Sequence, residues 1–452
     1  TSIDSAPISP TEFVWFELMP TLSLSFSIER LAILFALMSS FLWLVTTIYA
    51  IGYMRHHHEK NQTRFYQFFA VSMAAVMGIA FSANLFTLYI FYELLTLTTY
   101  PLVTHARNQQ AKKGGRTYLT ILLFTSVLFF LPALISVWLV AGTLDFTAGG
   151  VLSKAPSNGL FIAVLLPLFI LGIGKAAVFP FHRWLPAAMV APTPVSALLH
   201  AVAVVKGGVF AILKVCVYIF GIDLLPTLSS TQVLLYLVGF TIFIASLIAM
   251  REDNLKKRLA YSTVSQLGYI TLGALLANKA GIVGSGMHMA IHGFGKITLF
   301  FCAGAILIVT GRTRISEMAG IGRQMPITMV AFFIASLSII GLPPTAGIWS
   351  KWFLMQGTIQ AQEWWLLALL CLSSLMNLFY LLSIPLRGFF AQNALSTTDA
   401  SIREAPLPML FAIIICTTAC VWLFVTPEAL YQLAGGIFSD VPSGDLQMEL
   451  AQ

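Results

Sequence analysis

Apolar runs of about 20 residues recur along almost the whole chain, and a helix of that length spans the hydrocarbon core of a bilayer. Because backbone polar groups in lipid must be hydrogen-bonded within the segment, each run is expected to be helical. The composition agrees, since 58% of the 452 residues are hydrophobic and 10% are charged. Soluble domains carry about 25% charged residues. The sequence therefore predicts an all-α integral membrane protein.

Hydropathy predicts about twelve membrane-spanning helices. A single helix that is broken in its middle is expected in the fifth span. The expected spans lie near residues 29–53, 65–82, 84–104, 117–141, 159–189, 195–219, 231–250, 259–277, 282–310, 327–358, 364–386 and 406–425.

Short loops rich in Lys and Arg indicate the cytoplasmic side of a membrane protein. If the fifth span is one crossing, every basic loop falls on the same side, and both termini lie on the non-cytoplasmic side of an inner (plasma) membrane. The net charge of +7 then reflects these loops and not a nucleic-acid surface. The basic loops are residues 55–64, 105–116, 251–258, 311–323 and 387–403.

The chain shows no pattern typical of a cofactor or metal site. It has no Gly-rich phosphate loop, no haem-binding pair and no Fe–S spacing, and "GIGKAAVF" lacks the strand and the Ser or Thr that a nucleotide loop needs. We therefore expect no cofactor, no metal and no catalytic residue. Five cysteines inside apolar runs are interpreted as packing residues: Cys216, Cys302, Cys371, Cys416 and Cys420.

Ionisable side chains interrupt several apolar runs, although an intramembrane charge costs about 2.5–3.5 kcal/mol on insertion scales. Glu93 lies inside "YIFYELLTLTTYP", far from either end of its run. Lys175 follows a long apolar stretch, and Lys206 lies well inside the next one. The structural alternatives are a carboxyl bonded to a neighbouring Thr or Tyr, and lysines that extend toward a loop. A lysine that extends toward a loop is also the structural alternative for Lys351. That alternative is strongest for Lys214, which lies near the end of its run and is a weaker proton-transfer candidate.

Three titratable residues share one helical face in "GSGMHMAIHGFGKITLFFCAG", where His288, His292 and Lys296 follow the spacing i, i+4, i+8. Two histidines could bind a metal, but no carboxylate is nearby and the lysine would repel the cation. Imidazole accepts and donates protons near neutral pH, so proton relay is the preferred interpretation. His288, nearer the start of the run, is a weaker candidate, and His200 in "SALLHA" joins the proton-transfer set.

Proline and glycine interrupt two expected helices beside a lysine. Pro180 and Pro186 follow Lys175, and "GLPPTAGIWSKW" places two prolines before Lys351. Proline removes a backbone donor and clashes with the preceding turn, so both helices should be discontinuous. Broken helices in corresponding positions of two halves indicate an ion site in an inverted-repeat transporter.

The two breaks lie five expected helices apart, which predicts two inverted five-helix repeats. Residues 65–219 would form the first half-channel and residues 231–386 the second. Residues 1–64 are expected to form an N-terminal segment and the first helix, and residues 387–452 the last helix and an acidic tail.

Five segments carry a family resemblance: "FYELLTLTTYPLV", "GKAAVFPFHRWLPAAMVAPTPVSALLHA", "NLKKRLAYSTVSQLGY", "HMAIHGFGKITLFFCAG" and "GLPPTAGIWSKW". In this order they resemble the proton-conducting antiporter-like subunits shared by respiratory complex I, membrane-bound hydrogenases and Mrp-type sodium/proton antiporters. The resemblance spans about residues 29–425, and the loop "YMRHHHEKNQTRFYQFF" is most similar to the D-type subunits of Mrp antiporters. It implies membrane-subunit partners in a hetero-oligomeric complex.

The resemblance also implies roles for single residues. Glu93 and Lys175 match the glutamate–lysine pair of the family's first half-channel. Lys206 falls where members place a bridging lysine or polar residue. Lys296, with His292, matches the central lysine of the second half.

In the resulting hypothesis, protons enter from the cytoplasm in one half and cross the chain through its buried lysines and histidines. Opening of the Glu93–Lys175 pair would release a proton to the next site. Protons would leave past Lys351, which matches the terminal charged residue of the family's broken helix.

Two departures from the family pattern are expected. Family members usually have fourteen helices, whereas this chain starts where their third one begins, and Thr1 is not a methionine. Two N-terminal helices are thus absent or trimmed. The chain also lacks the long lateral helix found in the distal member of the complex I arm, which disfavours a position at the far end of such an arm.

Mrp-type cation/proton antiport, with sodium as the candidate exchanged ion, is the preferred function. The alternatives are a proton-pumping subunit of a redox complex, either complex I-like or a membrane hydrogenase, and a proton channel that energises an inorganic-carbon uptake partner. A self-sufficient antiporter is disfavoured because sodium prefers oxygen ligands and Glu93 is the only deep carboxylate in the expected spans. A scaffold without transport is disfavoured by the complete set of polar residues.

Overall fold

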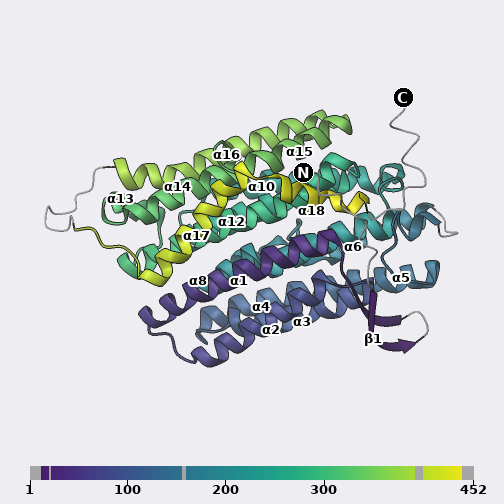
Figure 1. Cartoon of the computed structure of the whole chain (residues 1–452), viewed down its shortest axis with the longest axis horizontal. Coiled ribbons are helices and arrows are strands. Elements are labelled where there is room, and N and C mark those ends of the chain that lie inside the picture. Colours follow the sequence, from purple (N-terminus) through teal and green to yellow (C-terminus); the bar gives the residue numbers. More distant parts are fainter. Residues whose placement is uncertain (1–11, 20–21, 155–158, 392–400, 440–452) are drawn as a thin grey trace, which may run out of the picture.

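Long helices run side by side through the molecule. The computed structural model describes residues 12–19, 22–154, 159–391 and 401–439. Figure 1 shows α2, α3 and α4 along one side of the bundle and α14, α15 and α16 along the opposite side, with α12 between them. The expectation of a mainly helical membrane subunit is therefore confirmed.

The first part of the chain contributes helices that surround the first break. Their bounds are α1 (Arg30–His56), α2 (Gln62–Ala80), α3 (Leu85–Val103), α4 (Gln109–Thr125), η1 (Ser126–Phe130), α5 (Leu131–Ala141), η2 (Leu152–Lys154), α6 (Gly159–Gly172), η3 (Gly174–Ala176), η4 (Phe181–Arg183), α7 (Trp184–Ala187), η5 (Ala188–Val190), α8 (Thr193–Ala201), α9 (Val204–Lys214), η6 (Val215–Phe220) and η7 (Leu225–Thr227).

The second part surrounds the second break. Its elements are α10 (Ser229–Arg251), α11 (Leu255–Leu275), α12 (Lys279–Thr310), η8 (Ile315–Glu317), α13 (Ile321–Gln324), α14 (Pro326–Ile340), α15 (Gly347–Gln360), α16 (Trp364–Phe390), α17 (Leu407–Val425) and α18 (Glu428–Ser439).

Every expected span coincides with one or more of these helical elements. Among the described residues, α6 and α14 are shorter apolar helices, and each forms the first part of a broken span. Within the same residues, seven helical stretches are long and apolar enough to cross a hydrocarbon core: 30–56, 109–141, 193–220, 229–251, 279–310, 364–390 and 407–425.

Both expected breaks are present. The first begins earlier than the prolines suggest, because α6 ends at Gly172 and Lys175 lies inside the short turn η3. The second separates α14 from α15, with Gly341 in the left-handed region at φ 90°. A third discontinuity, which we did not expect, separates α8 from α9 at residues 202–203. No proline or glycine marks it in "HAVAVVK".

A β-hairpin near the N-terminus departs from the all-helical expectation. β1 (Glu12–Met19) pairs antiparallel with β2 (Leu22–Ser27). In β2 the residues Leu22, Leu24 and Phe26 alternate with serines, and this period of two is the pattern of a strand. Two backbone hydrogen bonds join β2 to the segment between α2 and α3, from Ser27 N to Phe81 O at 2.8 Å and from Ala83 N to Ser25 O at 3.0 Å.

Helix α18 also lies where only an acidic tail was expected. Leu430, Ala434 and Ile437 are buried, and their spacing forms one helical face. Helix α18 packs mainly against α1 and α12, and its Tyr431 ring lies 5.3 Å from that of Phe353 on α15. The acidic residues Asp440, Asp445 and Glu449 lie outside the described residues.

One end of the bundle gathers basic loops and is called the basic end below. It is the end near α13 in Figure 1, opposite β1. The loop after α10 and the loop after α12 meet there, where Ser316 donates to the Asp253 carboxylate from its backbone N at 2.9 Å and its Oγ at 2.8 Å. The hydrogen bonds from Ser316 lower the pKa of Asp253, so its carboxylate stays ionised at neutral pH.

Candidate proton-transfer site

Lys175 is fully buried in the first break, where the chain forms a short turn and not a regular α-helix. Its Nζ donates to the carbonyl of Tyr92 at 2.7 Å and to Thr96 Oγ1 at 2.6 Å, both on α3. The same ammonium lies 3.1 Å from the centroid of the Tyr92 ring. A carbonyl, a hydroxyl and an aromatic face therefore stabilise this cation inside the membrane domain.

Glu93, the expected partner of Lys175, lies on α3 beside Tyr92 and is not paired with that lysine. Within the described part of the chain no ion pair joins the two residues. Glu93 is half-buried, and its Oε1 is buried without a hydrogen-bond partner among the described residues. The predicted pairing of Glu93 with Lys175 stays a prediction.

Helix α9 holds the first break in place through a close backbone approach at Gly208. A methyl group there would lie 2.6 Å from the backbone N of Ala176 and from the carbonyl carbon of Lys175. Backbone atoms cannot rotate away from such a contact, so only glycine fits.

We expect Gly208→Ala to destabilise the folded subunit by about 1–3 kcal/mol, the usual cost of overpacking a core. The thermal unfolding midpoint of the purified complex checks this. Gly207→Ala is the matched control, because its methyl would meet the ends of two side chains and no backbone, Ile79 at 3.3 Å and Leu95 at 3.5 Å. Equal midpoints for the two variants would show that the close approach does not hold the break.

Lys206 and His292 meet at the centre of the molecule. Lys206 Nζ lies 2.6 Å from His292 Nδ1, and this contact joins α9 to α12. Both side chains are buried, at 0% and 1% exposure, and among the described residues His292 Nε2 has no hydrogen-bond partner. At this distance an amine and an imidazole can share one proton.

Two further candidates flank this contact. Lys296 Nζ donates to the Leu259 carbonyl at 3.3 Å. His200 is fully buried against the Phe300 ring, with 4.7 Å between ring centroids, and neither of its ring nitrogens has a hydrogen-bond partner in the described part of the chain. Buried, unpartnered imidazole nitrogens are rare in stable cores and are typical of functional or hydrated sites.

His288, the weaker candidate by sequence, lies between His292 and the second break. Its ring centroid is 5.8 Å from that of His292. His288 Nδ1 lies 2.9 Å from Ser350 Oγ, and Nε2 lies 3.1 Å from Gln266 Oε1. Ser350 immediately precedes Lys351 in α15, so the contact of His288 lies one residue from the second break lysine.

Lys351 repeats the environment of Lys175. Its Nζ donates to the Ile340 carbonyl and to Ser374 Oγ, each at 2.9 Å, and lies 4.9 Å from the centroid of the Tyr269 ring. Ile340 is the last residue of α14, so the lysine satisfies a carbonyl that the break leaves free. A cavity of about 280 Å³ between α15 and α16 reaches Lys351.

Lys214 lies apart from this group and has a partner that sequence reasoning missed. It forms an ion pair with Glu29, and its ammonium is 4.2 Å from the centroid of the Phe146 ring. Glu29 immediately precedes α1, in a position that hydropathy assigns to a helix end. An ion pair of this kind is what a structural role of Lys214 would require, and its proton-transfer role stays a prediction.

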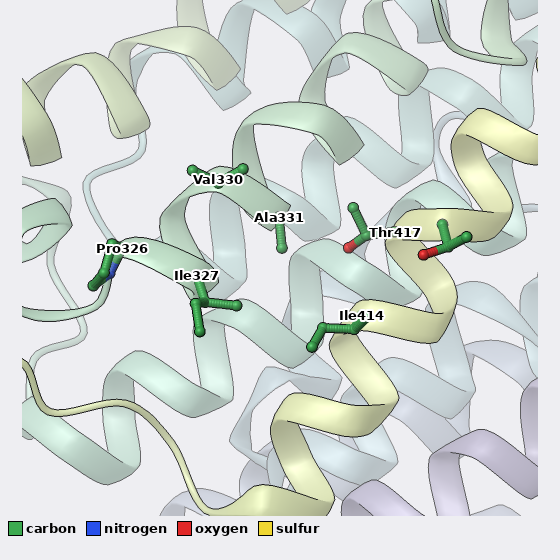
Figure 2. Close-up of a pocket in the computed structure, with 7 residues that line it drawn as sticks. Pro326, Ile327, Val330, Ala331, Ile414 and Thr417 are labelled. Atoms are coloured by element: carbon green, nitrogen blue, oxygen red, sulfur yellow. The ribbon is translucent and has the colours of Figure 1, made fainter.

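The apolar grooves on the flanks of the bundle do not belong to this site. Figure 2 shows one of about 340 Å³, where Ile327 and Ala331 of α14 face Ile414 and Thr417 of α17. None of its lining residues is ionisable.

Sequence reasoning also missed the neutral partners of the buried lysines. They are hydroxyl, amide and aromatic residues whose types are common in any membrane helix, and only their distance to a lysine distinguishes them. The missed residues are Tyr92, Thr96, Gln266, Tyr269, Ser350 and Ser374.

Two family descriptions match the chain. Residues 82–377 match "NADH:quinone oxidoreductase/Mrp antiporter, TM", and residues 15–66 match "NADH-Ubiquinone oxidoreductase (complex I), chain 5 N-terminus". The first match includes all the lysines and histidines of the site described above.

Curated relatives come from both branches of this group. NADH-quinone oxidoreductase subunit N of Desulforudis audaxviator is 32% identical over 83% of this chain and 77% of its own length. NAD(P)H-quinone oxidoreductase chain 5 of Synechocystis sp. is 32% identical over 73% of this chain, which spans 49% of that relative. The probable K(+)/H(+) antiporter A/B protein of Rhizobium meliloti is 33% identical over 74% of this chain and 33% of its own length.

Solved structures share the fold. A chain of the Mrp complex from Dietzia sp. superposes with a TM-score of 0.83 at 21% identity, covering 98% of this chain and 89% of that one. A chain of the membrane-bound sulfane sulfur reductase, an archaeal respiratory membrane complex, gives a TM-score of 0.84 at 22% identity, covering 98% and 88%.

Proposed function

The chain belongs to the NADH:quinone oxidoreductase/Mrp antiporter family of integral membrane subunits, and from this premise we propose that it conducts protons through its buried lysines and histidines as one subunit of a larger complex. The contact between Lys206 and His292 carries this proposal. Two basic groups share a proton there without any carboxylate nearby. A purely structural core would gain more from a hydrophobic pair.

The proposed path runs along the buried titratable groups from one break to the other. It leads from Lys175 through Lys206 to His292, with His288 and Ser350 between His292 and Lys351. Lys296 and His200 flank the central contact. Glu93, with an unpartnered oxygen, would form and break an ion pair with Lys175 as the charges of the other residues on the path change.

The arrangement of the chain in the membrane is part of the proposal. The basic end faces the cytoplasm by the positive-inside rule, and both termini face the other side of the inner (plasma) membrane. Residues 65–219 and 231–386 act as two inverted half-channels. The lysine-bearing break in each half and the similar partners of Lys175 and Lys351 support this division.

We assign the proton movement first to cation/proton antiport, with sodium or potassium as the exchanged ion. The potassium/proton antiporter relative and the fold of the Mrp complex chain support this assignment. The second candidate is a proton pump driven by a redox partner, which the extent of the match to subunit N favours. A proton channel that serves an inorganic-carbon uptake partner is the third.

Inside-out membrane vesicles that hold the complete complex test the proposed function. After respiration acidifies their interior, adding Na⁺ or K⁺ should release protons and restore the fluorescence of a pH-sensitive dye. Vesicles from cells without this chain are the control and should not respond. If neither cations nor an electron donor moves protons through this chain, the proposed function is wrong.

The same preparation separates the first two candidates. Mass spectrometry and a visible absorption spectrum of the gently purified complex report its partners. A colourless complex with small hydrophobic subunits supports antiport. Flavin or Fe–S absorbance, together with proton uptake driven by an electron donor, assigns the chain to a redox pump.

A further inference from the structure

The cavity beside the second break opens on the outer flank of the bundle. It has a volume of about 280 Å³ and lies between α15 and α16, which run along one side of the molecule in Figure 1. Leu342, Trp352 and Leu375 line it, and 37–56% of the surface of each is exposed. The cavity therefore opens sideways, at the level of the break, and not at either end of the bundle.

The lining of this cavity is apolar apart from two side chains, Lys351 and Ser374. Lys351 is 4% exposed, and its stem lies against the break because position 341 is a glycine. A methyl group on Gly341 would lie 2.7 Å from Lys351 Cδ. One buried cation in an otherwise apolar cavity suits a ligand with one anionic group and an apolar body.

The ammonium of Lys351 has a donor that its hydrogen bonds leave free. A lysine ammonium carries three N–H groups. In the described part of the chain, those of Lys351 bond to the Ile340 carbonyl and to Ser374 Oγ, and both acceptors are neutral. The three ion pairs among the same residues do not include Lys351. A buried charge without a counter-ion is costly, so an anion at this position would be bound favourably.

The two halves of the molecule differ in their carboxylates. In the first half, Glu93 follows Tyr92, whose carbonyl accepts from Lys175. In the second half, the three helices around the cavity, α14, α15 and α16, contain no Asp or Glu within their bounds. The second break lysine therefore has no carboxylate of the chain beside it, and a carboxylate in the cavity would supply one.

We propose that this cavity binds a long-chain carboxylic acid, with the carboxylate on Lys351 and the acyl chain along Trp352 and Leu375. A phospholipid phosphate stays ionised and would carry its charge into the membrane. A carboxylic acid enters neutral and gives its proton to a neutral Lys351 amine, which leaves an ammonium and a carboxylate with no net change in charge. The volume lies at the lower end of the about 300–1,000 Å³ that ligand pockets span, which suits one chain segment better than two.

The effect of the bound acid on transport rests on the proposed function. A lysine that pairs with a carboxylate keeps its proton, because the negative charge stabilises the ammonium. The acid should therefore slow the release of protons past Lys351. Binding itself does not depend on transport, so the two can be measured separately.

Photolabelling of the complete complex in nanodiscs tests the site. The probe is palmitic acid with a diazirine near the end of its chain, and mass spectrometry locates the labelled residues. We expect label within residues 348–355 and 374–378, which line the cavity, and displacement of the probe by excess unlabelled palmitic acid. The methyl ester of the same probe, which has no carboxylate, should label these residues about tenfold less.

A matched pair of variants on α16 separates the cavity from the surface around it. Leu375→Trp fills the cavity and should lower labelling by about tenfold. Leu372→Trp is the control, because Leu372 lies three residues away and is 44% exposed, but it does not line the cavity. It should be labelled as wild type. Lys351→Met, which removes the cation, should lose as much label as Leu375→Trp.

Three results would overturn the site. The first is equal labelling by the methyl ester, and the second is equal labelling of Leu375→Trp and Leu372→Trp. The third is an unlabelled cavity in the complete complex, either because a partner subunit covers it or because a photoreactive phosphatidylglycerol labels it in place of the acid.

A transport measurement on the labelled complex separates this site from the proposed function. Vesicles are irradiated with the probe, and albumin then removes the free acid, which carries protons by itself. The initial rate of proton movement should fall in proportion to the labelled fraction, and Leu375→Trp should keep its rate after the same treatment. Full labelling with an unchanged rate would contradict the role of Lys351 in the proposed function and leave the ligand site intact.

Discussion

Replacing Lys206 with methionine is expected to lower proton movement through the complex by about 10²-fold or more, the usual effect of removing a proton-transfer group. Lys206 Nζ lies 2.6 Å from His292 Nδ1. Among the described residues of the site, this is the contact that links a titratable residue of 65–219 to one of 231–386. Methionine fills the volume of the lysine stem but carries no proton. The path would therefore be cut between the half-channels.

The loss should concern transport much more than folding. Removal of the lysine leaves His292 Nδ1 without its partner, which costs about 1–3 kcal/mol for a buried polar group, but it also removes a buried amine. We expect the complex to assemble with a modestly changed unfolding midpoint. Lys279→Met, at an exposed position where α12 begins, is the control and should behave as wild type. A transport rate in Lys206→Met equal to that of Lys279→Met would contradict the path.

Replacing Glu93 with glutamine is expected to abolish coupled transport while the complex still assembles. Glutamine has nearly the same shape, and the Oε1 of Glu93 has no hydrogen-bond partner to lose. The substitution removes only the charge that pairs with Lys175 when the pair closes. Without that charge, Lys175 keeps its contacts with Tyr92 and Thr96. Its position then no longer depends on the charges of the other titratable residues of the path.

Initial rates of proton movement and the amount of assembled complex should be measured on the same membranes. Glu428→Gln is the matched control, because Glu428 lies on α18 and bonds to Gln432 at 2.9 Å on the exposed surface. Full coupled transport in Glu93→Gln would show that the pair has no part in the mechanism. Loss of assembly in that variant alone would assign Glu93 a structural role.

The sequence predicts the helices well because a bilayer admits few alternatives. Runs of apolar residues long enough to span lipid have to be helical, and every expected span coincides with helical elements. The two breaks were also predictable, since proline removes a backbone hydrogen-bond donor and glycine destabilises a helix. The break between α8 and α9 was not, because "HAVAVVK" contains neither residue and only tertiary packing selects it.

The hairpin and α18, near the two ends of the chain, were not predicted. A search for long apolar runs misses both, because they are too short or too polar. The hairpin does carry a period-two pattern in Leu22, Leu24 and Phe26, so a search for strands would have found it.

For the site, the charged members were predictable and their contacts were not. A lysine or histidine deep in an apolar run is conspicuous because its burial is costly. The pairing of Lys206 with His292, residues 86 positions apart, depends on how α9 and α12 pack.

The most direct test of the account is the initial rate of proton movement in vesicles that hold equal amounts of wild-type complex and of complex with Lys296→Met. Lys296 is fully buried in the centre of α12, and its Nζ contacts the Leu259 carbonyl at 3.3 Å. Methionine should therefore preserve the fold. We expect the complex with Lys296→Met to move protons no faster than vesicles that lack the chain. A rate equal to the wild type, with the complex fully assembled, would contradict a path through the buried lysines.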